Sequence, residues 1–245
     1  MESYFSALIH KLQSVSSSQQ EAIKRAGEQV ARALAEGGTW FLFGTGHSHM
    51  LAEEAFYRAG GLVSVSPILE SALMLHESAI QSSQMERLPN LARLILQERK
   101  LTRADVLLIA SNSGRNAVPV EMALAAKESG VFTIGVTSMD HTTRVASRAP
   151  GGQRLFEVVD VVIDNGAPYG DAAIPLADGV QMGPVSTVTG AAIVNAIAIE
   201  AARALQEGGY PVHTWKSANI DETQVNDDPD YVEAVQRAHR RVRHL

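Results

Sequence analysis

The sequence predicts an α/β protein built on a doubly wound, mostly parallel five-stranded sheet with helices on both faces. Short apolar runs alternate with longer segments of helical periodicity, which is typical of strand–helix–strand units. The short runs are rich in Val, Ile and Leu, as expected for strands buried on both faces. No internal repeat interrupts the pattern. We therefore expect an N-terminal helical segment (1–36), a central domain (37–207), and a C-terminal tail with a last helix (208–245).

The composition excludes several classes of protein. The chain has 245 residues, no cysteine and a formal net charge of −6. Disulfides and thiolate metal sites are therefore excluded, and a reducing compartment is expected. Basic residues form no block before the last few positions, which argues against nucleic acid as a partner. Neither a signal-peptide pattern nor an apolar run of the roughly 20 residues that span a bilayer is present. We expect a cytoplasmic protein with no membrane segment.

The expected elements follow along the chain. Apolar residues at helical spacing predict one or two helices over 3–36, which end at Gly37–Gly38. Short apolar runs predict strands at 39–43, 62–65, 106–110, 131–136 and 158–163. Later helices are expected up to Arg58 and at 67–77, 87–99, 116–128, 188–206 and 230–243. The stretches 78–84, 140–153 and 164–185 are polar or rich in glycine and proline, and are expected to be loops.

One loop, directly after the strand 106–110, has the composition of an anion site. It contains Ser111, Asn112, Ser113 and Gly114, and the next helix begins near Asn116. A strand that ends in small residues before a helix leaves backbone N–H groups without partners, and these donors and the helix dipole attract an anion. The side chains of the loop add further hydrogen bonds to phosphate oxygens. The alternative is that these residues only cap the helix.

A similar loop follows the first strand. Two glycines, Gly44 and Gly46, let the backbone approach a ligand, and Thr45 and Ser48 supply donors before a helix. A dinucleotide fingerprint requires glycine at the place of His49, so a Rossmann cofactor is weakly supported and we expect no cofactor. The alternative is a plain turn between strand and helix.

Small hydroxyl residues occur a third time, where Ser186 and Thr187 open the late apolar helix. Taken alone, this pair is more simply explained as a helix cap. In parallel sheets, however, the loops that follow the strands meet at one edge, where ligands bind. Three such loops at one edge favour an anion-binding pocket.

These motifs resemble those of the SIS (sugar isomerase) phosphosugar-binding domain. The loops FGTGHS and SNSGRN and the late Ser-Thr pair carry the resemblance over residues 36 to 207. It implies that the second loop holds the phosphate, that the first lies along the sugar, and that Ser186 and Thr187 complete the pocket. A set of uncharacterised members, labelled phosphosugar isomerases by analogy, resembles this chain more closely. The runs that carry this likeness are GHSHMLAEEAFYRAGG, DNGAPYGDA, GPVSTVTGAAIVNAI and SANIDE with the downstream Asn226.

The sequence departs from characterised members of that family at two positions. Counted from Ser48, Arg58 stands where phosphoheptose isomerases and N-acetylmuramic acid 6-phosphate etherases carry a catalytic glutamate. Glu54 stands where the heptose isomerases carry a metal-ligating histidine. No metal is therefore expected in this pocket, and Glu54 and Arg58 can also form a simple ion pair on one helical face. Asp164, Asp171 and Asp178 are a conceivable metal set, but their spacing is not diagnostic.

The resemblance implies a phosphosugar substrate, and the expected reaction is aldose–ketose isomerisation through an enediol, which needs an acid or base. The catalytic candidates are His47, Glu54, Glu70 and His76. Among them His47 is favoured, because a loop beside two glycines faces a ligand. Further carboxylates and basic groups near the pocket or across a subunit interface are Glu53, Glu77, His213 and Lys216. The alternatives are a phosphosugar lyase, etherase or deglycase, and a sensor without chemistry. The family also implies a homodimer or homotetramer.

Overall fold

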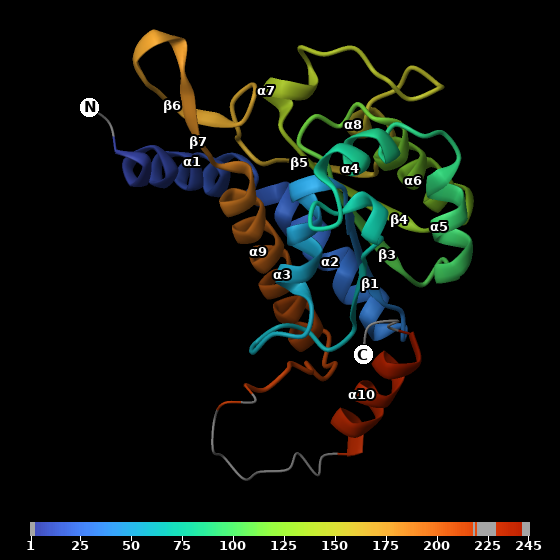
Figure 1. The fold of residues 1–245 in the computed structure, drawn as a ribbon. Coiled ribbons are helices and arrows are strands. Elements are labelled where there is room, and N and C mark those ends of the chain that lie inside the picture. Colours follow the sequence, from blue (N-terminus) through green and yellow to red (C-terminus); the bar gives the residue numbers. More distant parts are fainter. Residues whose placement is uncertain (1–2, 218, 220–228, 242–245) are drawn as a thin grey trace.

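The fold is a five-stranded parallel sheet between layers of helices (Figure 1), in a computed structural model that describes residues 3–217, 219 and 229–241. The strands, in chain order, are β1 (Trp40–Gly44), β2 (Val65–Ile68), β3 (Val106–Ala110), β4 (Phe132–Thr137) and β5 (Val161–Asp164). Their order across the sheet is β2-β1-β3-β4-β5, and every neighbouring pair is parallel. The sequence-based fold class is therefore confirmed.

Each face of the sheet has its own hydrophobic core. On one face, α2 (Gln20–Ala35), α3 (Met50–Ala55) and α9 (Ser186–Glu207) pack over alternate strand residues such as Leu42 and Leu108. On the other face, α5 (Leu91–Arg99), α6 (Ala117–Glu128) and α8 (Leu155–Val158) cover residues such as Phe43 and Ile109. Burying each large apolar side chain contributes about 1.5–3 kcal/mol. The strands therefore hold their carboxyl ends at fixed positions, and the first two candidate loops follow the ends of β1 and β3.

The second strand is shifted relative to the sequence expectation. It covers Val65–Ile68 instead of 62–65, so Pro67 lies inside a strand. Proline is tolerated there because β2 is at the sheet edge, where one side of the backbone has no strand partner. The expected helix over 67–77 is wrong, since only the 3₁₀ turn Ser71–Leu73 forms. Instead α4 (Ala79–Met85) forms in the polar stretch, where the Ser78 hydroxyl accepts a hydrogen bond from the Gln81 amide.

A β-hairpin replaces part of the expected loop at 164–185. Strands β6 (Ala172–Pro175) and β7 (Gln181–Pro184) pair antiparallel and stand off from the central sheet beside α1 (Tyr4–Ser18), as Figure 1 shows. The hairpin turn is possible because Asp178 and Gly179 adopt positive φ angles of 58° and 77°. The hairpin rests on α1, because the Tyr4 hydroxyl donates to the Pro184 carbonyl at 2.7 Å.

Two short helices, α7 (Met139–Thr142) and α8, were not expected from the sequence, and β5 begins three residues later than expected; the other elements differ from expectation at their ends. The helical segment after the first loop consists of a 3₁₀ turn (Gly46–His49) and α3, and it ends before Arg58. The stretch 140–153 begins in α7. The last helix, α10 (Pro229–Arg241), packs beside Val63, and its final expected residues, 242 and 243, lie outside the described residues, as does Asn226.

Helix α9 is the only helix in the described part of the chain that is long and apolar enough to cross a membrane. A single such helix is weak evidence, because the core helix of a soluble protein has the same properties. In this fold α9 packs along α2 and against α3.

Candidate functional site

The three hydroxyl-rich loops meet in one cavity at the carboxyl edge of the sheet. The cavity is narrow: it has an accessible volume of about 10 Å³, within about 270 Å³ of space that includes open solvent. Its lining residues are His47, Ser48, Leu51, Ala110, Ser111, Asn112, Val136, Asn165, Ser186 and Thr187. The structure therefore brings together residues from all three loops that the sequence singles out, at the edge where parallel sheets bind ligands.

The second loop is held in shape by its own backbone and by its serine. The Ser111 hydroxyl is buried and accepts a hydrogen bond from the Gly114 amide at 3.2 Å, so its own proton stays available for donation. Gly114 has a φ of +57°, and a side chain there would meet the hydroxyl oxygens of Thr137 and Thr142 at 3.1 Å, so glycine is required. Ser113 is half-buried next to the cavity without lining it, and its side chain makes no hydrogen bond within the described residues.

An asparagine pair connects the second loop to the loop after β5. The Asn165 amide nitrogen donates to the Asn112 side-chain oxygen at 3.0 Å, and the Asn165 oxygen accepts from the Ala167 amide at 3.0 Å. Asn165 is buried and lines the cavity. Sequence reasoning missed it, although its position directly after a strand is the available signal. The pair fixes Asn112 so that it faces the cavity.

The first loop contributes His47 and Ser48 to the cavity. His47 is exposed and Ser48 is half-buried. Gly44 is needed for the packing of the loop and not for ligand binding, because a side chain there would lie 2.4 Å from the backbone of Ser48. Gly46 has a φ of +55°, which turns the backbone into the 3₁₀ segment that presents His47.

Thr45 and Asn116, both expected to bind substrate, are instead joined to Glu86. The Glu86 carboxylate accepts from the Thr45 hydroxyl at 2.8 Å and from the Asn116 amide nitrogen at 2.7 Å. Thr45 and Asn116 are buried, and neither lines the cavity. Glu86 follows α4 and was not singled out from the sequence, because nothing local marks its role. It connects the first loop to the second.

At the third loop, the side chain of Asp171 caps the start of α9. One carboxylate oxygen accepts from the amides of Val185 and Ser186 at 3.1 and 2.8 Å, and the other accepts from the Ser186 hydroxyl at 2.6 Å. The hydroxyl proton of Ser186 is therefore already used in a hydrogen bond within the protein. The hydroxyl of Thr187 makes no side-chain hydrogen bond in the described part of the chain and is open to the cavity.

The other expected catalytic groups do not line the cavity. Glu54 pairs with Arg58 and accepts from the Asn195 side chain on α9 at 2.9 Å. Glu70 forms an ion pair with the buried Arg99. His76 is exposed and lies 3.7 Å from the Glu77 carboxylate. Among the lining residues that the structure describes, His47 is the only titratable group.

The three aspartates considered as a metal set are not brought together. Asp164 accepts hydrogen bonds from the backbone amides of Met139 and Gly166, Asp171 caps α9, and Asp178 lies at the hairpin turn. No group of three potential metal ligands among His, Asp and Glu is found in the residues that the structure describes.

A histidine above β4 lies close to the same edge of the sheet. Its burial and the charge of Arg115 lower the pKa of His141, although Asp140 and Asp171 act in the opposite direction. The neutral ring agrees with its geometry, since Nδ1 accepts a hydrogen bond from the Gly170 amide at 3.3 Å. His141 therefore supports the loop after β5 as an uncharged acceptor.

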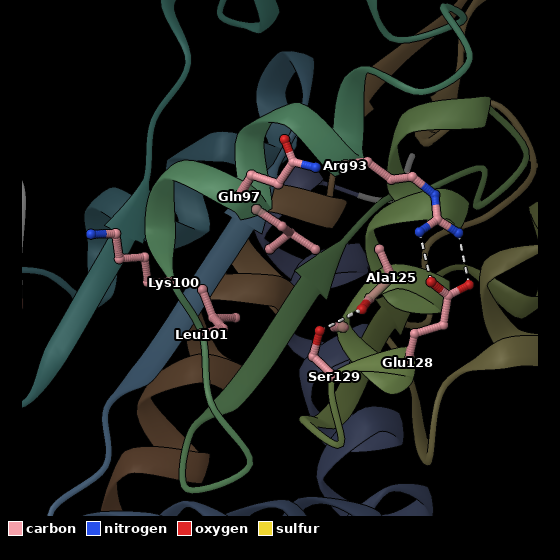
Figure 2. Close-up of a pocket in the computed structure, with 9 residues that line it drawn as sticks. Arg93, Gln97, Lys100, Leu101, Ala125, Glu128 and Ser129 are labelled. Atoms are coloured by element: carbon pink, nitrogen blue, oxygen red, sulfur yellow. Dashed lines mark hydrogen bonds and ion pairs between the residues drawn. The ribbon is translucent and has the colours of Figure 1, made fainter.

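A larger groove, with an accessible volume of about 310 Å³ against about 10 Å³, lies between α5 and α6 (Figure 2). Arg93 and Glu128 close one side with two hydrogen bonds of 2.6 and 2.7 Å. Lys100 and Ser129 place this groove at the amino edge of the sheet, since each precedes a strand. Ligands of open parallel sheets bind at the opposite edge, so the smaller cavity is the candidate site.

The chain belongs to the SIS domain family, because the family model for the SIS domain matches residues 3–138. It is 44% identical over 220 residues to a UPF0309 protein of Halalkalibacterium halodurans, covering 89% of this chain and 88% of that protein. A UPF0309 protein of Geobacillus kaustophilus is also 44% identical, over 89% of this chain and 87% of its own length.

Solved structures show the same fold. A phosphoheptose isomerase from Neisseria gonorrhoeae superposes with a TM-score of 0.55 at 17% identity, covering 80% of this chain and 92% of that chain. A phosphoheptose isomerase from Francisella tularensis superposes with a TM-score of 0.52 at 15% identity, covering 82% of this chain and 95% of that chain. At these identities the likeness establishes the architecture, and the chemistry has to be argued from the site.

Proposed function

We propose that this protein binds a phosphorylated sugar in the cavity between the three loops. The observation that carries the proposal is the convergence of Ser111, Asn112 and Thr187 with the start of α9 in one small polar cavity at the carboxyl edge. A phosphate is bound by hydroxyl and backbone donors at a helix start without an excess of basic residues. The second loop, with Ser111 and Asn112 lining the cavity and Ser113 beside it, holds the phosphate. The sugar extends toward His47.

The proposed reaction is the interconversion of an aldose and a ketose phosphate. In the aldose, C2 loses a proton while the C1 carbonyl oxygen gains one, which gives an enediol. The enediol then gains a proton at C1 and loses one from the O2 hydroxyl, so no electrons leave the substrate. His47 is the group proposed to carry the proton between C2 and C1. It is favoured because Glu54 and Glu70, the other candidates, are engaged by arginines.

Deuterium exchange tests this reaction. Incubating the protein with a sugar phosphate in heavy water is expected to place deuterium on C1 or C2, which NMR detects. His47→Asn is expected to reduce the exchange on the order of 10²–10⁴-fold with little loss of binding. The control His239→Asn changes an exposed histidine on α10 and is expected to leave exchange unchanged. Full exchange in His47→Asn would remove this residue from the reaction.

A sensor is the second candidate function, because no carboxylate lines the cavity in the described part of the chain. A sensor is expected to bind a sugar phosphate without deuterium exchange and without a new product. A lyase, etherase or deglycase is expected to release a substituent, which the same NMR spectra detect. These outcomes separate the alternatives.

We further propose that the protein is a cytoplasmic homodimer or homotetramer. Support comes from an apolar surface made by α1, the β6–β7 hairpin and α9. Its exposed apolar side chains include Phe5, Ile9, Val180, Met182 and Ile199. Between α1, α2 and α9 this surface is hollowed into a groove lined by Leu12, Ile23 and Ala196. Exposed apolar patches of this kind mark protein–protein interfaces.

A further inference from the structure

Arg115, inside the second loop, has no partner for its charge. It lies between Gly114 and Asn116 and forms no ion pair within the described residues. Its Nε atom is buried and makes no hydrogen bond. By contrast, Arg93 and Arg154 each hold a carboxylate through two hydrogen bonds. A buried guanidinium nitrogen without a partner loses its hydration without compensation, and no carboxylate within the described residues offsets the charge of Arg115.

Two more arginines lie beside Arg115. The Arg148 amide donates to the Arg115 carbonyl at 2.7 Å, and the Arg148 guanidinium lies 3.5 Å from the Asn116 side-chain oxygen. Arg87 directly follows Glu86, the carboxylate that binds Asn116. Neither Arg87 nor Arg148 forms an ion pair in the described part of the chain. Burial and repulsion from Arg148 and Arg87 lower the pKa of Arg115, while Tyr169 acts in the opposite direction.

The carboxylates of this region are engaged elsewhere. Glu86 binds Thr45 and Asn116, and Asp171 caps α9. Asp140 pairs with Arg144 and accepts from the Tyr169 amide at 2.8 Å. His141 is a neutral acceptor and supplies no charge. Neutral donors leave the charges of Glu86 and Asp171 in place, but in the described part of the chain neither carboxylate forms an ion pair with Arg87, Arg115 or Arg148, so the three arginines form a cationic cluster next to the phosphate loop.

We propose that the sugar phosphate bound here carries a second anionic group, a carboxylate or a second phosphate, which Arg115 and Arg148 bind. This inference rests on the proposed function, because it assigns the first phosphate to Ser111 and Ser113. A guanidinium binds either group through paired N–H donors, so one cluster serves both chemistries. The second anion relieves the repulsion between the arginines and accepts hydrogen bonds from the terminal nitrogens of the Arg115 guanidinium, which are not among the buried atoms without a partner.

Calorimetric titration of three probes tests the proposal: glucose 6-phosphate, fructose 1,6-bisphosphate and 6-phosphogluconate. The protein is expected to bind at least one doubly anionic probe about tenfold or more tightly than the singly phosphorylated sugar. Arg115→Gln is expected to abolish that advantage while changing the affinity for glucose 6-phosphate less than about threefold. Arg148→Gln is expected to reduce the affinity advantage of the doubly anionic probe without abolishing it. Whichever doubly anionic probe binds more tightly identifies the second group as phosphate or carboxylate.

The control Arg103→Gln removes the same charge from an exposed position before β3, at the opposite edge of the sheet. It is expected to leave all affinities unchanged. Equal affinity for all three probes, or an equal loss for all of them in Arg115→Gln, overturns the second-anion site and leaves the proposed phosphosugar function standing. Absence of binding by every probe, in protein whose folding is verified by circular dichroism, overturns both.

Discussion

The carboxylate of Asp171 accepts a hydrogen bond of 2.6 Å from the Ser186 hydroxyl and also accepts from the backbone amide of Ser186 at the start of α9. The hairpin base is thereby fixed to the start of the core helix. Asp171 has a φ of 71°, a conformation that asparagine also tolerates, so Asp171→Asn changes the cap without straining the backbone.

Asp171→Asn keeps an oxygen that accepts from the amides but removes the negative charge at the start of α9, and it is expected to lower the free energy of unfolding by about 0.3–1 kcal/mol. Chemical denaturation measures this. Asp178→Asn is the matched control, because Asp178 also has a positive φ but lies exposed at the hairpin turn. Equal stability of the two variants would show that the Asp171 contacts do not stabilise α9.

Glu86 is expected to set the relative position of the first two loops. Glu86→Gln keeps the size of the side chain but removes its charge and one of its two acceptor oxygens, so the bonds from Thr45 and Asn116 can no longer both be made to a charged acceptor. The expected result is a loss of about 1–3 kcal/mol in the free energy of unfolding, together with weaker sugar-phosphate binding. Glu128→Gln removes an equal charge in the groove of Figure 2 and should leave binding unchanged. If Glu86→Gln binds the ligand as wild type does, the two loops do not depend on this bridge.

Asp160 is expected to make the stability depend on pH. Burial acts to raise its pKa, but hydrogen bonds from Lys127 and Thr133 outweigh burial and hold the pKa below the ordinary value of 3.8. A group with a depressed pKa stabilises the fold above its ordinary pKa, and that contribution is lost as the pH falls through its folded pKa. Asp160→Asn should therefore cost about 1–3 kcal/mol near neutral pH and progressively less below about pH 4.

Denaturation of the wild type and of Asp160→Asn between pH 7 and pH 3 measures the difference. Thr133→Val removes the hydroxyl that donates to Asp160 at 2.7 Å and is expected to weaken the pH dependence. A difference between wild type and Asp160→Asn that stays constant over this range would contradict the assignment.

The apolar surface on α1 and α9 is expected to be buried between subunits. Ile199→Glu places a charge on this surface and should shift the mass measured by light scattering from that of the oligomer to that of the monomer. Ile80→Glu changes a residue of α4 that is 75% exposed, away from this surface, and should leave the mass unchanged. Monomeric wild-type protein, or an oligomer unaffected by Ile199→Glu, would show that this surface has another role.

The buried centre of the fold was predictable from sequence. Strand β3 matches its expected range, 106–110, because five apolar residues between polar neighbours have few alternatives to a buried strand. The edge strand β2 was misplaced, since Ser66 and Pro67 obscure its pattern. The hairpin at 172–184 was missed because its turn depends on Asp178 in a left-handed conformation.

The meeting of the first two loops followed from parallel topology, whereas the third loop follows the β6–β7 hairpin, and neither its position nor the partners of individual side chains followed from that topology. Asn165 bonds to Asn112, and Glu86 to Thr45, across 53 and 41 positions of sequence. Such contacts are set by how elements pack, and no local pattern encodes them. For the same reason Thr45 and Asn116 resembled ligand donors in the sequence but bind a carboxylate in the structure.

Calorimetric comparison of a sugar phosphate with its free sugar tests the central claim most directly, with wild type, Ser111→Ala and Ser113→Ala. The wild type is expected to bind the phosphorylated sugar and not the free sugar. Each serine variant should lose about 1–3 kcal/mol of binding free energy, because a hydrogen bond to a charged phosphate is lost. Binding of the free sugar as tight as that of its phosphate, or unchanged affinity in both variants, would contradict a phosphate site in the second loop.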